Sequence, residues 1–184
     1  MDETNITAQF VTEPSGRFPI FSGSWWIRFG THSRFSHVDI VYPDGTLVGA
    51  RDDFHVDWKG KYNTGVQRRP ADYANFSVRE RVVVPVTPDE QRVIYQFLDA
   101  QIGKPYDESA IAGFVLGRDW RSPRAWFCSE LGAAAFEHAN VVQVLTPESK
   151  ITPNDYYLLC GAAGGRRQVF TPKIEVRGGE WAYA

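Results

Sequence analysis

Cys128 is the residue whose type and position best suit covalent chemistry. It lies in the segment W-F-C-S-E-L at 126–131, at the predicted start of a helix that runs to about residue 139. A thiol at a helix N-terminus lies at the positive end of the helix dipole, near backbone N–H groups without intrahelical acceptors, and both favour the thiolate. The sequence therefore predicts a thiol nucleophile, with a buried structural cysteine as the alternative. Cys160, at the end of a short apolar helix, is interpreted as a core residue.

A thiolate nucleophile needs a base that is held in place, and the chain has four histidines. His138 falls near the end of the Cys128 helix, about 15 Å away at 1.5 Å per residue, and is too distant to serve. His37 opens an alternating strand over 36–42, whose apolar positions point to one face and leave His37 and Asp39 on the other. We predict His37 as the base, with a histidine on a surface strand as the alternative. The remaining two, His32 and His55, fall in predicted loops.

Short elements in the order strands, helices, strands must position these side chains, and this order favours an α+β fold. Thr87, Pro88 and Glu90 form a capping box with proline at the first helical position, and Gly103 ends that helix. The region up to about residue 20 shows no clear period. The predicted strands cover 36–42, a return strand from 47, 65–69, 78–86, 168–170 and 173–176; the predicted helices cover 25–29, 88–102, 108–116 and 126–139, with a short one from 152.

Length and composition limit the classes of protein that fit. The 184 residues are enough for one domain, 1–184, with a core at about 20–177. Twenty basic against 22 acidic residues give a net charge of −2, which argues against a nucleic-acid partner. There is no apolar run of the roughly 18 residues that a membrane span needs, and no basic, apolar signal segment, so a cytoplasmic protein is expected. Two cysteines and no paired histidines predict neither a metal site nor a cofactor.

Three segments together resemble a known family. They are R-F-S-H-V-D-I-V at 34–41, G-K-P-Y-D at 103–107 and W-F-C-S-E-L at 126–131. They are similar to the base strand, the G-x-P-Y-D segment and the nucleophile helix of the permuted papain-like branch of the NlpC-type cysteine peptidase superfamily, the branch that includes YiiX-like and YaeF-like proteins. In that branch the histidine precedes the cysteine, as it does here. The resemblance spans about residues 24–159.

The resemblance implies a circularly permuted papain-like fold, with the nucleophile helix packed on an antiparallel, partly barrel-like sheet. It implies a thiol hydrolase that attacks an amide or ester bond through a thioester. Carried over by position, Cys128 becomes the nucleophile and His37 the general base. Tyr106 either lines the site or packs beside Pro105.

The third catalytic position is where this sequence departs from the family, which usually has a polar side chain where this chain has Gly49. Asp39 is one substitute, although two residues along a strand separate it from His37 by about 6–7 Å. Asp52 is the other, because a two-residue turn at 44–45 would pair it with His37. A three-residue turn would pair His37 with Arg51 instead. We predict Asp52, and a water or a backbone carbonyl is a further alternative.

The substrate is less defined by the sequence. The resemblance favours a peptide of the peptidoglycan type, and a fatty-acyl ester substrate, with hydrolase or acyltransferase chemistry, is the alternative. Trp25 and Trp26 are predicted to wall a substrate groove, or else to belong to the core. A different class of function is a non-catalytic binding module or a virion structural module with a degenerate site. A phage or prophage association fits either class, and the oligomeric state is not predicted.

Overall fold

The structure is a computed structural model of the chain, and its fold is of the mixed α+β class, as the order of elements predicts. It describes residues 4–12, 28–29, 32–51, 64–71, 73–74, 76–107, 124–145, 151–169, 174–177 and 180–183.

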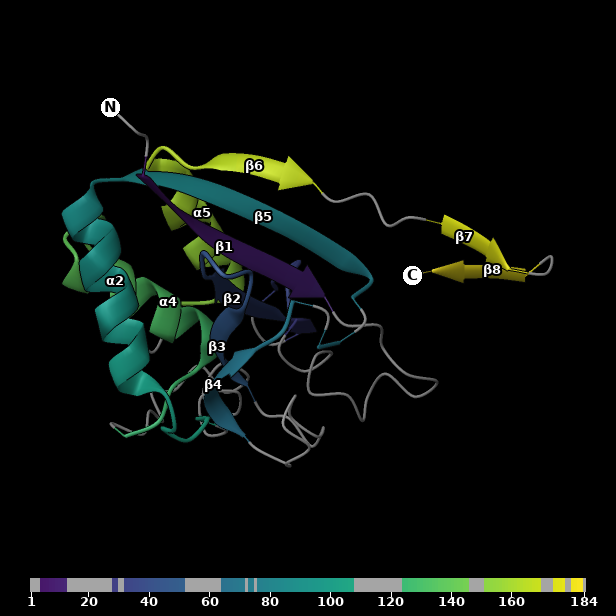
Figure 1. Cartoon of the computed structure of the whole chain (residues 1–184), viewed down its shortest axis with the longest axis horizontal. Coiled ribbons are helices and arrows are strands. Elements are labelled where there is room, and N and C mark those ends of the chain that lie inside the picture. The colour runs from purple at the N-terminus through teal and green to yellow at the C-terminus, as the bar shows by residue number, and fades with distance from the viewer. Residues whose placement is uncertain are drawn as a thin grey trace.

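A six-stranded antiparallel sheet in the order β4-β3-β2-β1-β5-β6 organises the molecule (Figure 1). Its two edges, β4 and β6, do not pair with each other, so the sheet is open and a partly barrel-like shape fits it. The strands are β1 (Thr4–Thr12), β2 (His37–Val41), β3 (Leu47–Arg51), β4 (Gly65–Arg69), β5 (Val78–Val86) and β6 (Arg166–Val169).

The strand β1 corrects the prediction that the first twenty residues lack a period. It lies between β2 and β5, in the middle of the sheet, so the core begins well before residue 20. A period-two signal is present, because Ile6, Ala8 and Phe10 are fully buried and alternate with polar residues over residues 5–9. Asparagine, glutamine and alanine are poor strand formers, which hides this alternation.

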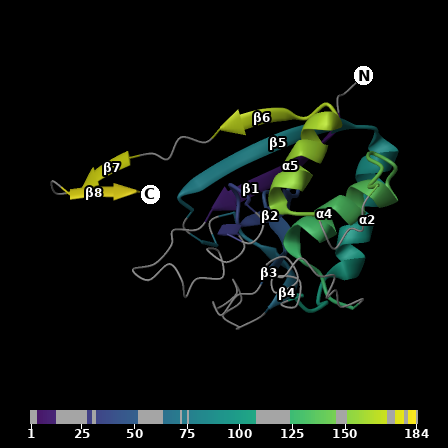
Figure 2. The ribbon, with the colours of Figure 1, turned by 180° about the vertical axis from the view of Figure 1, so that it is seen from behind.

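Three helices among the described residues pack together against the sheet, and Figure 2 shows α5 and α4 in front of it and α2 at its side. They are α2 (Pro88–Gln101), α4 (Cys128–His138) and α5 (Pro153–Ala162). The capping box of Thr87 and Glu90 forms, and Gly103, with φ +90°, follows the end of α2. The helix predicted for 108–116 and most of the one predicted for 25–29 lie outside the described residues.

The helix α4 is central, as its small side chains predict. Every residue from Cys128 to Phe136 is buried, and the helix packs against β2, β3, α2 and α5. Gly132 permits the close approach of α5, since a Cβ there would lie 2.6 Å from the ring of Tyr156. The small residues of α4 thus let four elements converge on the helix that carries the thiol.

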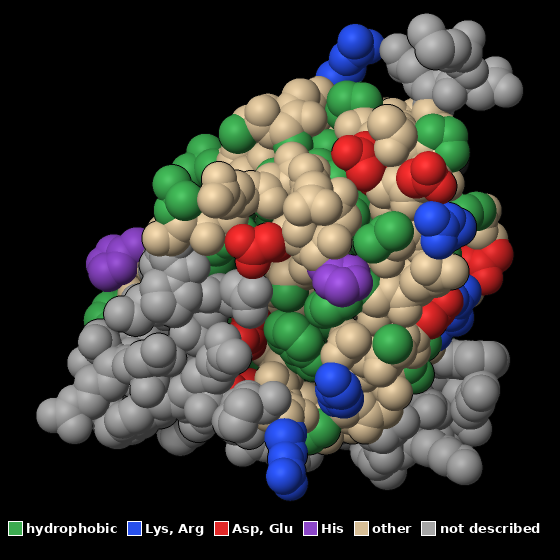
Figure 3. All heavy atoms as spheres, turned by 90° about the vertical axis from the view of Figure 1, so that its left-hand side faces the viewer, with side chains coloured by type: hydrophobic (Ala, Val, Ile, Leu, Met, Phe, Trp, Pro, Cys, Tyr) green, Lys and Arg blue, Asp and Glu red, His purple; other side chains and the backbone are tan. Residues whose placement is uncertain are grey.

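The strands after α5 belong to two separate sheets. β6 pairs with β5, whereas β7 (Ile174–Arg177) and β8 (Glu180–Tyr183) form their own two-stranded hairpin (Figure 1). On the side where α2 lies, basic, acidic and hydrophobic side chains are interspersed on the surface (Figure 3). Of the helices in the described ranges, none has the length and apolar character needed to cross a membrane.

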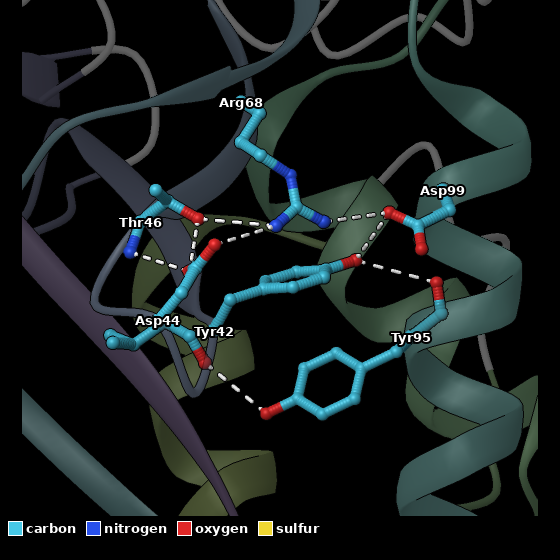
Figure 4. Close-up of polar contacts among 7 residues, drawn as sticks. Tyr42, Asp44, Thr46, Arg68, Tyr95 and Asp99 are labelled. Atoms are coloured by element: carbon cyan, nitrogen blue, oxygen red, sulfur yellow. Dashed lines mark hydrogen bonds and ion pairs between the residues drawn. The ribbon is translucent and has the colours of Figure 1, made fainter.

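A polar cluster fixes the hairpin between β2 and β3 against α2 (Figure 4). The Asp44 carboxylate accepts the Thr46 backbone N–H at 2.9 Å, and Arg68 donates to Asp44 at 3.3 Å and to Asp99 of α2 at 3.0 Å. The Arg68 guanidinium also stacks 4.0 Å from the centre of the Tyr42 ring. Because both ends of the turn are held, the register of the two strands is set.

Candidate active site

The residues around Cys128 fix the start of α4. Glu130 accepts the backbone N–H of Phe127 at 3.2 Å, which caps the helix. The Ser129 hydroxyl donates to the carbonyl of Ile151 at 2.6 Å, and the Phe127 and Leu131 side chains belong to the core. These neighbours hold Cys128 as the first residue of α4, where the N–H groups of the first turn lack intrahelical acceptors.

The segment 103–107 attaches the start of α4 to the sheet. The Gly103 N–H donates to Val66 of β4 at 2.9 Å, and the Trp126 N–H donates to Pro105 at 3.0 Å. Gly65 makes room for this crossing, because a Cβ there would lie 2.1 Å from the Lys104 carbonyl oxygen. The helix α4 therefore begins at a place set by backbone contacts to β4.

Tyr106 supports this junction. It forms an isolated bridge with Trp126, and its ring lies 5.8 Å from that of Phe127, the residue before Cys128. The structure thus places Tyr106 beside the start of α4, in a packing contact.

The segment that precedes His37 is also anchored. Glu80 of β5, only 1% exposed, accepts hydrogen bonds from Arg34, from Arg167 of β6 at 2.9 Å and from Tyr157 of α5 at 3.1 Å. The Ser36 N–H donates to Val11 of β1 at 3.0 Å. These contacts tie the entry of β2 to its neighbouring strands and to α5.

His37, Asp39 and Cys128 meet in the interior. Nε2 of His37 lies 2.8 Å from Oδ1 of Asp39, and the imidazole also forms a hydrogen bond with the Cys128 side chain. Since Asp39 occupies Nε2, Nδ1 is the ring nitrogen that remains for the thiol. The two residues that the sequence analysis singled out as nucleophile and base, 91 positions apart, are therefore in contact.

The electrostatics of this group favour a charged imidazole. Burial lowers the pKa of His37, but the Asp39 carboxylate and the hydrogen bonds with Asp39 and Cys128 outweigh it and raise the pKa to about 9. Burial likewise raises the pKa of Asp39, while His37, Arg69 and Tyr73 lower it to about 2. At neutral pH the pair is an imidazolium held by a carboxylate, which is the partner that a thiolate requires.

Gly49 provides the space for Asp39. The two residues lie opposite each other on β3 and β2, and a Cβ on Gly49 would lie 2.2 Å from Oδ1 of Asp39. The carboxylate thus occupies the volume that a side chain at position 49 would fill. The position of Asp39 therefore depends on the glycine at position 49, where the family that the sequence resembles usually has a polar side chain.

The register that paired His37 with Asp52 is not the one that forms. Ile40 pairs with Val48, and the Tyr42 N–H donates to Thr46 at 2.8 Å, so the turn has three residues, 43–45. Continued along the strands, this register places Arg51 opposite His37. The physical reason for this longer turn is that the Asp44 side chain accepts the Thr46 N–H and so stabilises it. Asp52, Trp25 and Trp26 lie outside the described residues.

Tyr73, Arg51 and Arg69 extend the group, and the sequence analysis named only Arg51 of these, as the partner of His37 in a three-residue turn. The Tyr73 hydroxyl donates to Oδ2 of Asp39 at 2.9 Å, and Arg51 donates to the Tyr73 oxygen at 3.0 Å. Arg69 donates to the carbonyl of Gly49 at 3.0 Å and helps to lower the pKa of Asp39. The alternation of Arg69 with Gln67 on β4 was the available signal for a polar face.

The group is enclosed. Cys128 is 2% exposed and His37 is 6% exposed. The gap beside Cys128, between α4, β2 and β3, is too small to hold a water molecule. Among the described ranges, no three His, Cys, Asp or Glu side chains are placed to hold a metal ion.

Comparison with known proteins leaves the family unassigned. No protein-family model matches the chain, and no curated protein matches it. The chemistry of the site must therefore be inferred from its own geometry.

Proposed function

We propose that the protein is a thiol hydrolase that cleaves an amide bond with Cys128 as nucleophile and His37 as base. Asp39 orients the imidazole. The observation that carries this proposal is the buried contact of a helix-terminal thiol with an imidazole whose other nitrogen lies 2.8 Å from a carboxylate. Buried thiols in structural roles do not require a histidine whose charge is held in this way.

The acylation step uses these groups in order. In the resting site the Cys128 proton already lies on Nδ1 of His37, as an imidazolium beside a thiolate, and the thiolate attacks the carbonyl carbon of the substrate. N–H groups in the first turn of α4 are placed to stabilise the oxyanion. His37 then gives its proton to the leaving nitrogen as the C–N bond breaks, which leaves a thioester on Cys128.

Hydrolysis of the thioester completes the cycle. His37 takes a proton from water, the hydroxide attacks the thioester carbon, and the C–S bond breaks. Throughout, Asp39 holds the ring so that Nδ1 faces the sulfur. The carboxylate stays ionised because its pKa is held near 2.

The wider proposal concerns fold and substrate. The order of elements, with β2 carrying the base before α4 carrying the thiol, supports a circularly permuted papain-like arrangement. On the resemblance of the three segments, we assign the substrate to peptides of the peptidoglycan type. Asp39 replaces Asp52 in this proposal, because the observed register gives it the contact with His37.

Selective alkylation tests the nucleophile, and the chain offers a matched control thiol. Cys160 is fully buried in α5, and burial raises its pKa to about 12. We expect iodoacetamide to label Cys128 in the native protein much faster than Cys160, and H37A to abolish the difference. Equal, slow labelling of both thiols would contradict an activated Cys128.

The reaction itself is tested with soluble peptidoglycan stem peptides. New amino groups should be released by the wild type and by C160A, and not by C128A. Retention of the wild-type rate in C128A would exclude Cys128 as the nucleophile.

The enclosure of the site favours a second candidate, a non-catalytic module that keeps the fold. With Cys128 2% exposed, this candidate predicts no labelling by a bulky electrophile under native conditions. The hydrolase predicts labelling that rises with pH and depends on His37.

A further inference from the structure

Asp39 lies on the same strand as His37, and this limits how their side chains can come into contact. Side chains two residues apart on a strand leave it in parallel, with their α-carbons about 6–7 Å apart. A separation of 2.8 Å between Nε2 and Oδ1 therefore requires the carboxylate to lean along β2. A leaning carboxylate needs a second contact that keeps it there.

We infer that Tyr73 is a positioning residue that holds the Asp39 carboxylate in its leaning position and so sets the protonation of His37. The catalytic meaning of this inference rests on the proposed function, although the contact itself does not.

The direction of the hydrogen bonds supports the assignment. Arg51 has only donors, so its bond to the Tyr73 oxygen at 3.0 Å uses a lone pair of the hydroxyl. The single hydroxyl proton of Tyr73 is then directed at Oδ2 of Asp39, 2.9 Å away. Both oxygens of Asp39 are thereby engaged, Oδ1 by His37 and Oδ2 by Tyr73.

The surroundings keep this donor in place. The Arg51 guanidinium lies 4.9 Å from the centre of the Tyr73 ring, and that of Arg69 lies 5.5 Å from it on the side of β4. Burial and the neighbouring Asp39 carboxylate raise the pKa of Tyr73 well above 10. The hydroxyl therefore remains a donor over the whole range in which His37 titrates.

The charged and titratable groups that face this cluster come from three strands, the loop after β4 and the start of α4. They are His37 and Asp39 of β2, Arg51 of β3, Arg69 of β4, the Tyr73 hydroxyl and Cys128 of α4. Tyr73 is the neutral member among them, so its replacement by phenylalanine removes two hydrogen bonds, the one donated to Asp39 and the one accepted from Arg51, and no charge. The phenyl ring still packs beneath Arg51 and Arg69, which favours folding of the variant.

The experiment measures the pKa of His37 by NMR in the wild type and in Y73F. We expect the pKa to fall in Y73F, because the released carboxylate moves away from Nε2. The control is Y95F, since Tyr95 also donates to β2, through the Val41 carbonyl at 3.4 Å, and its ring packs on Tyr42 at the other end of that strand. Y95F should leave the pKa of His37 unchanged. An unchanged pKa in Y73F would overturn the inference.

A double-mutant comparison separates positioning from general destabilisation. Y73F should slow alkylation of Cys128 about tenfold, the loss that corresponds to one hydrogen bond to a charged group. In the D39N background the same change should have almost no effect. Equal effects in both backgrounds would show that Tyr73 does not act through Asp39. If Cys128 proves unreactive in the wild type, the proposed function fails, while the NMR measurement still decides the role of Tyr73.

Discussion

Replacement of Asp39 by asparagine should remove the positive charge of His37 at neutral pH. The substitution keeps the size of the side chain and removes its negative charge. Burial is the largest single influence on the imidazole and lowers its pKa, and the Asp39 charge is the main influence that opposes it. Without that charge, burial prevails, so the pKa of His37 should fall from about 9 to below its ordinary 6.5.

The size of this effect in free energy follows from the two pKa values of His37. The difference between about 9 and 6.5 corresponds to about 3 kcal/mol in favour of the charged imidazole. Because the pKa in the folded state exceeds the pKa in the unfolded state, this stabilisation is fully present below pH 6.5 and is lost as the pH rises through about 9. The pKa of Asp39 is shifted the other way, so its contribution is present above 3.8 and is lost as the pH falls through about 2.

Two assays measure the effect of D39N. The imidazole Cε1–H resonance gives the pKa of His37, and urea unfolding at several pH values gives the stability. The contribution of His37 should decline between pH 6.5 and 9 in the wild type, and this decline should disappear in D39N. D44N is the matched control, because Asp44 lies in the same hairpin and pairs with exposed groups of Thr46 and Arg68. A pKa that stays near 9 in folded D39N would refute the reasoning.

Two further substitutions test the steric basis of the site and of the helix that carries it. G49A should lower the pKa of His37, because its Cβ would lie 2.2 Å from Oδ1 of Asp39 and displace the carboxylate; NMR checks this, and an equal effect of G49A in a D39A background would contradict it. G132A should destabilise the protein by about 1–3 kcal/mol in urea unfolding, because its Cβ would lie 2.6 Å from the buried Tyr156 ring. G161A on α5 is the control, since nothing lies within 4 Å of its Cβ. Alanine there should be neutral or stabilising by up to about 1 kcal/mol. A G132A variant as stable as G161A would show that α4 and α5 are not in close contact.

Local signals predicted the elements well where they were strong. The capping box at Thr87, the short helix from residue 152 and the small-residue helix after Cys128 formed as expected. The strand β1 was missed because weak strand formers such as Asn5 and Ala8 interrupt its strong ones, and its place in the sheet depends on pairing with residues 37–41 and 78–86. Pairing over such separations leaves little trace in a local window.

The sequence alone determined the type and order of the reactive groups, a thiol at a helix start and an imidazole at the head of an earlier strand. The tertiary structure decided what supports them. One extra residue in the turn after β2 shifts the cross-strand partner of His37 from Asp52 to Arg51, and it places Gly49 opposite Asp39. The side chains of Asp39 and Tyr73 meet only after β2, β3 and β4 have paired in register, because hydrogen bonding is sensitive to displacements far smaller than the 3.3 Å rise per residue of a strand.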